Sequence, residues 1–465
     1  MKSKFLLIVF LLNSVAVFAQ KIYEKPVVDE RVEVMYIVFR LAGAEEYQDC
    51  AIPLYANEID KHFEKYKNHS LIQYTKKLRS KYWMSFNSVA NLAIHLEIKN
   101  GKLIFNKNIN INLDDRWQKD SIPKYMVLLN DFYKKSKFND FFVKTENIRK
   151  FAEENFAKEV TDKIDFDWFK KFFGFLPEHK FRIIISLADA GHNYGPKIVY
   201  KDETEEYYAI MCSSQVDGTG FPIYDGILGS VENISIHEIC HSFCRVPINE
   251  YLDKLLPQAT VFYQLYQKEL YEYARCGKPE SLLHEIFVRA CVFQYNKDHK
   301  KYDEDEMKSE IYQGFLWLPQ LTEAFGRYKN DTIYKTFRDF MPEIVKLQNS
   351  LNPQQLYDEI AEITGTNIPN NCDTVDYNLD YITVRFNNPM LIYPNVTRYL
   401  DIRPKLEFTK EEKWNDNGTE WTCYIKLKPD TQYKIWLPYF LFFDAKNQYY
   451  LRNDHYLNFK TKSKQ

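Results

Sequence analysis

The chain has 465 residues and a formal net charge of −2, from 62 Lys and Arg against 64 Asp and Glu. This balance gives no electrostatic basis for binding nucleic acid or an anionic membrane surface. The length predicts two or three domains, each large enough to bury its own core.

The first residues have the pattern of an export signal. Lys2 and Lys4 precede an apolar run over residues 5–18, and Ala19 supplies a small residue for cleavage. We therefore expect residues 1–19 to be a signal peptide and the mature chain to be exported, either periplasmic or secreted. The run is shorter than the roughly 20 residues that span a bilayer, and no later stretch is long and apolar enough, so we expect no membrane span.

Residues 20–175 are predicted to form a mainly helical region. Asp29 begins a helical pattern that ends at Gly43, a residue suited to a helix C-cap. Asn100-Gly101 lies between alternating apolar residues, which is a hairpin signal. Apolar residues at three- and four-residue spacing predict further helices at 57–66, 85–98, 125–137 and 145–161.

A strand-rich stretch follows this helical region. Glycine and proline in residues 189–196 predict a loop within it. His192 is interpreted as a loop histidine, because its spacing from His237 follows no ligand pattern. Short strands are predicted at 181–187, 197–200 and 207–212.

Residues 231–247 carry the arrangement on which the functional prediction depends. His237 and His241 are four apart, so on a helix they share a face and can bind one zinc ion at roughly 2.0–2.1 Å each. Glu238 projects about 100° from His237, so it can accept a proton from the metal's water without ligating the metal. The alternative is two hydrogen-bonded core histidines beside a salt-bridged glutamate. Pro247 is expected to end the helix.

A two-histidine zinc site needs a third protein ligand, with one position left open for water. Glu285 is the predicted ligand, because it lies in the apolar helix 280–293, where an unpaired carboxylate is costly. The alternative is an ion pair with Arg289, one turn later, and both interactions can hold together. Glu280 and His284 are the fallback ligands.

The remaining polar candidates carry less information. Tyr295 and His299 follow the predicted third-ligand helix and are candidates for stabilising an oxyanion, although core packing is favoured for the tyrosine. The eight cysteines show no repeated spacing, so we interpret them as small core residues rather than a disulfide framework. A pair between Cys372 and Cys423 stays open.

Beyond residue 366 the pattern changes to short alternating strands. Ile382, Val384 and Phe386 share one face, and the same alternation recurs at residues 421–427 and 433–437. Asn and Gly residues mark turns between these segments. Over about a hundred residues this pattern indicates a β-sandwich.

The motif helix with Glu285 resembles the zinc peptidases whose ligands are the two histidines of His-Glu-x-x-His and a glutamate on a later helix. That resemblance implies His237, His241 and Glu285 as zinc ligands and Glu238 as general base. Strands just before such a helix suit a zinc protease, in which an edge strand commonly holds an extended substrate by backbone hydrogen bonds.

Residues 27–350 also resemble an uncharacterised family of exported bacterial proteins, domain of unknown function 4932, which implies no substrate. The closing segments 382–390 and 457–461 resemble bacterial immunoglobulin-like domains. The motifs that carry the family resemblance are residues 29–33, 39–43, 193–196 and 237–243, and Glu285 with Val288-Arg289-Ala290.

We therefore predict an α+β protein: a signal peptide at 1–19, a mainly helical region at 20–175, a zincin-like catalytic region with a small sheet at 176–366, and an immunoglobulin-like β-sandwich at 367–465. The predicted function is that of an exported zinc metallopeptidase acting on a peptide or protein substrate. The main alternative is a non-catalytic binding protein with a structural or degenerate metal site, and a fourth protein ligand would favour it. A glycosidase with paired carboxylates is a weaker alternative.

Overall fold

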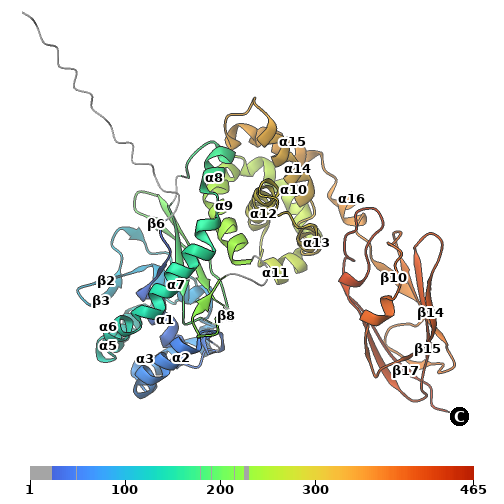
Figure 1. Cartoon of the computed structure of the whole chain (residues 1–465), viewed down its shortest axis with the longest axis horizontal. Helices are drawn as coiled ribbons and strands as arrows, with labels where there is room; N and C mark the ends of the chain where they lie inside the picture. Colours follow the sequence, from blue (N-terminus) through green and yellow to red (C-terminus); the bar gives the residue numbers. More distant parts are fainter. Residues whose placement is uncertain are drawn as a thin grey trace, which may run out of the picture. The chain divides into compact units, whose positions relative to one another are not determined.

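The computed structural model describes residues 24–48, 50–177, 180–189, 191–213, 215–224 and 230–464. The predicted signal peptide lies outside these described residues. The fold is α+β, as expected, with helices outweighing strands (Figure 1). Within the described residues, no helix combines the length and the apolar character needed to cross a membrane.

The chain divides into two compact units. The first comprises residues 1–166 and 176–238, and the second comprises residues 167–175 and 239–465. The division falls within one long helix, α9 (Ser230–Glu250). Each unit is described by itself.

The first unit is built on a mixed five-stranded sheet. Strands β1, β5 and β7 run parallel, and β6 lies antiparallel to β7. Ile183, Ile184 and Ile185 on β5 are almost completely buried, which agrees with the predicted buried strand. The sheet order is β1 (Val27–Val28), β5 (Lys180–Ser186), β7 (Glu205–Cys212), β6 (Lys197–Tyr200), β4 (Ile109–Asn110).

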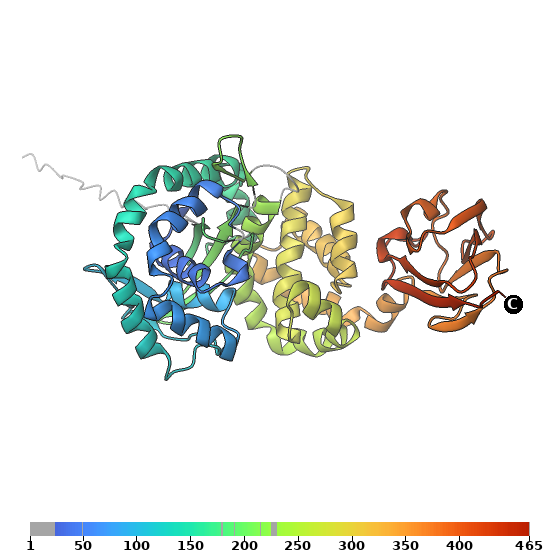
Figure 2. The same cartoon turned by 90° about the horizontal axis from the view of Figure 1, so that it is seen from below.

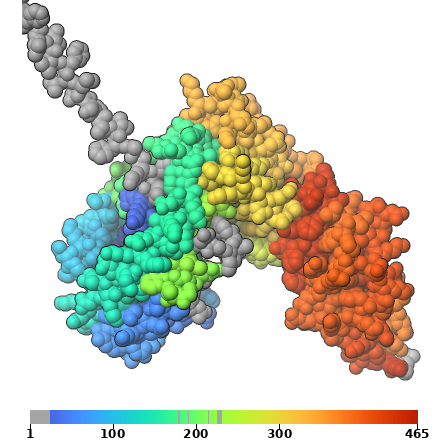
Figure 3. Space-filling view, viewed as in Figure 1, coloured from blue at the N-terminus to red at the C-terminus, as the bar shows by residue number. Residues whose placement is uncertain are grey.

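Helices gather around this sheet (Figure 2). The first, α1, is capped by Asp29, whose side chain accepts a hydrogen bond from the Arg31 backbone N–H, and it is followed by Gly43 at φ +80°. Residues of α5 to α7 form much of the visible surface of this unit (Figure 3). The helices are α1 (Glu30–Leu41), α2 (Pro53–Phe63), α3 (Ser70–Tyr82), α4 (Asn87–Ile94), α5 (Ile122–Lys135), α6 (Phe138–Lys144) and α7 (Glu146–Glu159).

Two short hairpins complete the first unit. The predicted hairpin is confirmed: β2 (Leu96–Lys99) pairs with β3 (Lys102–Phe105) across Asn100 and Gly101, which both have positive φ. A two-residue turn of this kind matches the twist of the flanking strands. The second hairpin joins β8 (Gln215–Val216) and β9 (Pro222–Ile223).

The second unit begins with helices. The prediction that Pro247 ends its helix is wrong, because α9 continues to Glu250. Pro279 occupies the first turn of α12, as expected. The helices are α8 (Phe166–Phe173), α10 (Leu252–Leu265), α11 (Gln267–Ala274), α12 (Pro279–Asp298), α13 (Glu304–Tyr312), α14 (Leu318–Asn330), α15 (Phe337–Ser350) and α16 (Pro353–Asp358).

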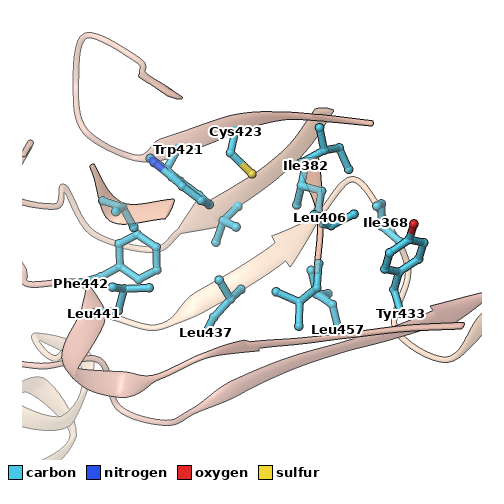
Figure 4. Close-up of a cluster of buried hydrophobic side chains, with 14 of the residues drawn as sticks. Ile368, Ile382, Leu406, Trp421, Cys423, Tyr433, Leu437, Leu441, Phe442 and Leu457 are labelled. Atoms are coloured by element: carbon cyan, nitrogen blue, oxygen red, sulfur yellow. The ribbon is translucent and has the colours of Figure 1, made fainter. Parts of the chain in front are cut away.

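The C-terminal part of the second unit consists of two four-stranded sheets that face each other across one hydrophobic core (Figure 4). Trp421 and Cys423 from one sheet meet Leu437 and Leu457 from the other. The predicted alternation is confirmed, since Ile382, Val384 and Phe386 are all buried. One sheet has the order β10 (Ile363–Thr366), β12 (Tyr381–Phe386), β15 (Glu420–Lys426), β14 (Glu407–Trp414); the other has β11 (Cys372–Val375), β17 (His455–Thr461), β16 (Gln432–Leu437), β13 (Asp401–Arg403).

Candidate metal centre

Three side chains with metal-ligating atoms meet at α9. His237, His241 and Glu285 each offer one ligand atom, and these atoms lie within 4.8 Å of one another. His241 Nε2 is 3.6 Å from Glu285 Oε1. That distance is close to the edge of a tetrahedron around a zinc ion, roughly 3.4 Å for bonds of about 2.1 Å. The structure therefore brings together the three residues predicted as ligands.

The burial pattern of α9 explains why its polar residues face outward. Ile236, Ile239, Cys240 and Phe243 are completely buried, whereas His237, Glu238 and His241 are half-buried. The apolar side of the helix thus packs in the core, and its polar side is accessible to solvent and ligands.

Neighbouring helices hold the second half of α9 in place. The Phe243 ring stacks on Phe173 of α8, with ring centroids 4.5 Å apart and an interplanar angle of 15°. On another side, Cys244 Sγ lies 3.6 Å from Cys291 Sγ of α12. Because α12 also carries Glu285, this packing fixes the third candidate ligand relative to His241.

A charged network supports Glu285. Arg289 forms a salt bridge to Glu285 Oε2, and its Nε donates a hydrogen bond of 2.7 Å to Glu310 Oε2 on α13. The guanidinium also lies over the Phe315 ring, 4.1 Å from its centroid. The Glu285–Arg289 ion pair, which the sequence left open as the alternative to a ligand role, is therefore present, and Glu285 Oε1 is the oxygen that faces His241. Arg289, anchored by Glu310, thus orients the Glu285 carboxylate as a residue behind a metal ligand does.

The first unit places a loop against Glu238. A Cβ atom at Gly195 would lie 2.9 Å from Glu238 Oε2, which is closer than real Cβ contacts come. The loop is fixed by Tyr194, which exchanges two backbone hydrogen bonds with Ile210 of β7. Glycine at position 195 therefore leaves the room that the Glu238 carboxylate occupies.

The other sequence candidates lie elsewhere. Among the described residues, the group of potential ligands around His237 includes neither Glu280 nor His284. Tyr295 is completely buried and packs against Trp168 and Phe169, which agrees with a core role. His192 is partly exposed and pairs with Asp189 at 3.3 Å.

The structure adds two residues to the site for which the sequence indicated no role there. Glu310 completes the network behind Glu285, and Gly195 contacts Glu238. No rule of spacing connects either residue with the motif helix. Gly195 was indicated only as part of a predicted loop and of the family motif at residues 193–196, neither of which assigned it a role. All eight cysteines are free thiols, six of them buried and two, Cys50 and Cys372, partly so.

The comparisons with known proteins identify the family. Residues 26–347 match the model of a domain of unknown function, DUF4932. The chain belongs to this family. The DUF4932 region contains α9, α12 and the candidate metal ligands, and it ends before the two facing sheets. No curated protein matches the chain.

Solved structures give only distant similarities. Native alpha-2-macroglobulin from Escherichia coli, spanning domains MG0-NIE-MG1, is 13% identical over 24% of this chain and 35% of its own, with a TM-score of 0.18. The surface layer protein SbsC, domains 1–6, is 16% identical over 49% of this chain and 33% of its own, with a TM-score of 0.20. This chain thus spans about a third of the length of each.

Proposed function

We propose that the protein is an exported zinc metallopeptidase that hydrolyses peptide bonds. The observation that carries this proposal is the convergence of His237, His241 and Glu285, with Glu238 beside the first histidine. Two imidazoles and one carboxylate are the ligand set of many catalytic zinc sites, which keep a fourth position for water. Lys2, Lys4 and the apolar run that follows them support export.

The residues present fit a zinc ion. His237, His241 and Glu285 would hold it, while Arg289 and Glu310 would orient Glu285. Bound zinc supplies a Lewis acid that polarises the scissile carbonyl and lowers the pKa of a coordinated water. Glu238 acts as the general base that takes the proton from the attacking water, and it then donates this proton to the leaving amine.

A strand edge beside Glu238 supports an extended peptide as substrate. Tyr194 and Pro196 direct their backbone hydrogen bonds to β7, through Ile210 and Tyr208. Because backbone groups alternate along an extended chain, those of Gly195 point away from β7. A peptide that adds to this edge would place its backbone beside the general base.

The direct test is hydrolysis of a mixed peptide library by the purified zinc-loaded protein, with products identified by mass spectrometry. Cleavage should stop when a chelator removes the metal and return when zinc is restored. Cleavage that persists at full rate in the metal-free protein would reject the proposal.

Substitution of Gly195 by Ala should impair hydrolysis without affecting metal content. The new methyl group would displace the Glu238 carboxylate, and a shift of about 1 Å in a catalytic group costs roughly 100-fold in rate. Gly218→Ala is the matched control, because an added Cβ at Gly218 meets no atom within 4 Å. Equal kcat values for the two variants would show that position 195 does not constrain Glu238.

We further propose that the two facing sheets form an immunoglobulin-like domain, as the strand order supports. Strands β10, β12, β15 and β14 take the places of A, B, E and D, while β13, β16 and β17 take those of C, F and G. At the start of β16, the Tyr433 hydroxyl accepts a hydrogen bond of 2.9 Å from the Lys428 backbone N–H. This contact is typical of the tyrosine corner of such domains.

Tyr433→Phe should lower the free energy of unfolding of this domain by about 1 kcal/mol, because the Lys428 N–H loses its acceptor. Denaturant unfolding of the full chain, followed by tryptophan fluorescence, to which Trp421 in this core contributes, measures the change. Tyr399→Phe serves as the control, since the Tyr399 side chain is 68% exposed. An equal effect of both substitutions would argue against a tyrosine corner at Tyr433.

A further inference from the structure

A polar pocket lies along the edge of the sheet beside Glu238. It has a volume of about 660 Å³, within the range of ligand sites, and all of its lining residues belong to the first unit. Gly195 lines this pocket and also contacts the Glu238 carboxylate. Gly195 therefore separates a group bound in the pocket from the side chain of the proposed general base, Glu238.

The side-chain carbonyl oxygens of two asparagines in the pocket wall already accept hydrogen bonds from neighbouring residues. Asn91 Oδ1 accepts a hydrogen bond of 2.9 Å from the Asp114 backbone N–H, and Asn87 Oδ1 accepts one from Arg116. Arg116 is itself held by an ion pair of 2.7 Å with Asp114. Because their carbonyl oxygens are engaged, both pocket-lining asparagines have their amide Nδ2–H groups left to serve as donors to a ligand.

His95 supplies the complementary group. Its side chain is almost completely buried, and its Nδ1 lies 2.7 Å from the Asn91 backbone oxygen, so Nδ1 carries the proton. Burial lowers the pKa of His95, which keeps the ring neutral. Nε2 is then a hydrogen-bond acceptor, and His95 lines the pocket.

We propose that this pocket is a substrate subsite for a neutral carboxamide, the side chain of Gln or Asn in the peptide. The amide donors of Asn87 and Asn91 match the carbonyl oxygen of a carboxamide, and His95 Nε2 matches its N–H. An apolar side chain leaves all of these groups unsatisfied, and a carboxylate leaves the His95 Nε2 acceptor without a donor; such mismatches are strongly disfavoured. This inference rests on the proposed peptidase function, because it assigns the specificity of the same site.

The test uses three peptides that differ at one position next to the scissile bond, with Gln, Met or Glu of similar size. Wild type should cleave the Gln peptide with a kcat/KM at least about tenfold above the other two. Asn91→Asp keeps the acceptor for the Asp114 N–H but removes the donors, so the preference for Gln should disappear. Asn87→Asp, which places a carboxylate against Arg116, should weaken the same preference and provides a second variant if the first does not fold.

Asn106→Asp is the control outside the pocket. Asn106 Oδ1 accepts a hydrogen bond from the Asn108 backbone N–H, so the charge and the local geometry change in the same way, and the preference should stay. Equal cleavage of all three peptides by wild type, or an unchanged preference in both pocket variants, would overturn the inference.

Failure of the pocket and failure of the peptidase function remain distinguishable. If wild type cleaves no peptide, the specificity of the pocket is tested by binding alone. The fluorescently labelled Gln, Met and Glu peptides are then titrated with the zinc-loaded Glu238→Gln protein. Tighter binding of the Gln peptide, lost when Asn91→Asp is added, supports the carboxamide subsite. Equal binding of the three peptides rejects it.

Discussion

Glu238→Gln should reduce kcat for peptide hydrolysis by about 100- to 10,000-fold, the range expected for loss of a general base. Gln has almost the same shape as Glu but cannot accept the proton of the attacking water. The zinc content should stay unchanged, because Glu238 is not among the three grouped ligand atoms. Turnover and metal analysis on the same preparation measure both quantities.

The matched control for this substitution lies on the same helix. Glu232 occupies the first turn of α9, outside the candidate ligand group, so Glu232→Gln should leave turnover within a factor of about two, as is usual for substitutions away from a site. Hydrolysis by Glu238→Gln at the wild-type rate would remove the assigned role of Glu238.

Glu285→Ala should weaken zinc binding by more than about 100-fold, since losing a ligand costs more than losing a residue that merely orients one. The substitution also leaves Arg289 and Glu310 without the carboxylate that completes their network. Competition with a chelator of known affinity measures the zinc dissociation constant.

The fallback ligand on the same helix gives the control. Glu280 lies in the first turn of α12 and is absent from the ligand group, so Glu280→Gln should bind zinc as wild type does. Retention of zinc by Glu285→Ala together with loss by Glu280→Gln would move the third ligand to the start of the helix.

Local signals predicted much of the fold. The Asn100-Gly101 hairpin follows from the positive φ values that its turn needs, and the first turn of α12 follows from Pro279. Pro247 failed as a stop signal, because the neighbouring Ile248 is completely buried and tertiary packing offsets the lost hydrogen bond. Burial of this kind depends on partners distant in sequence, which local patterns do not encode.

The candidate site likewise contains residues that local sequence patterns predict and residues that only the fold brings to it. His237 and His241 follow from helical spacing, and Glu285 follows from the cost of an isolated carboxylate in an apolar helix. Gly195 and Glu310 come from the loop before α9 and from α13, so only the fold brings them to Glu238 and Arg289. The amide-lined pocket likewise combines α4 with two later segments of the chain.

The zinc content of the purified mature protein tests the central claim most directly. After incubation with excess zinc and gel filtration, wild type should retain about one zinc per chain, while His237→Ala should retain almost none. A wild-type chain that retains no zinc, or a His237→Ala chain that retains as much as wild type, would contradict the assignment of His237, His241 and Glu285 as a metal centre.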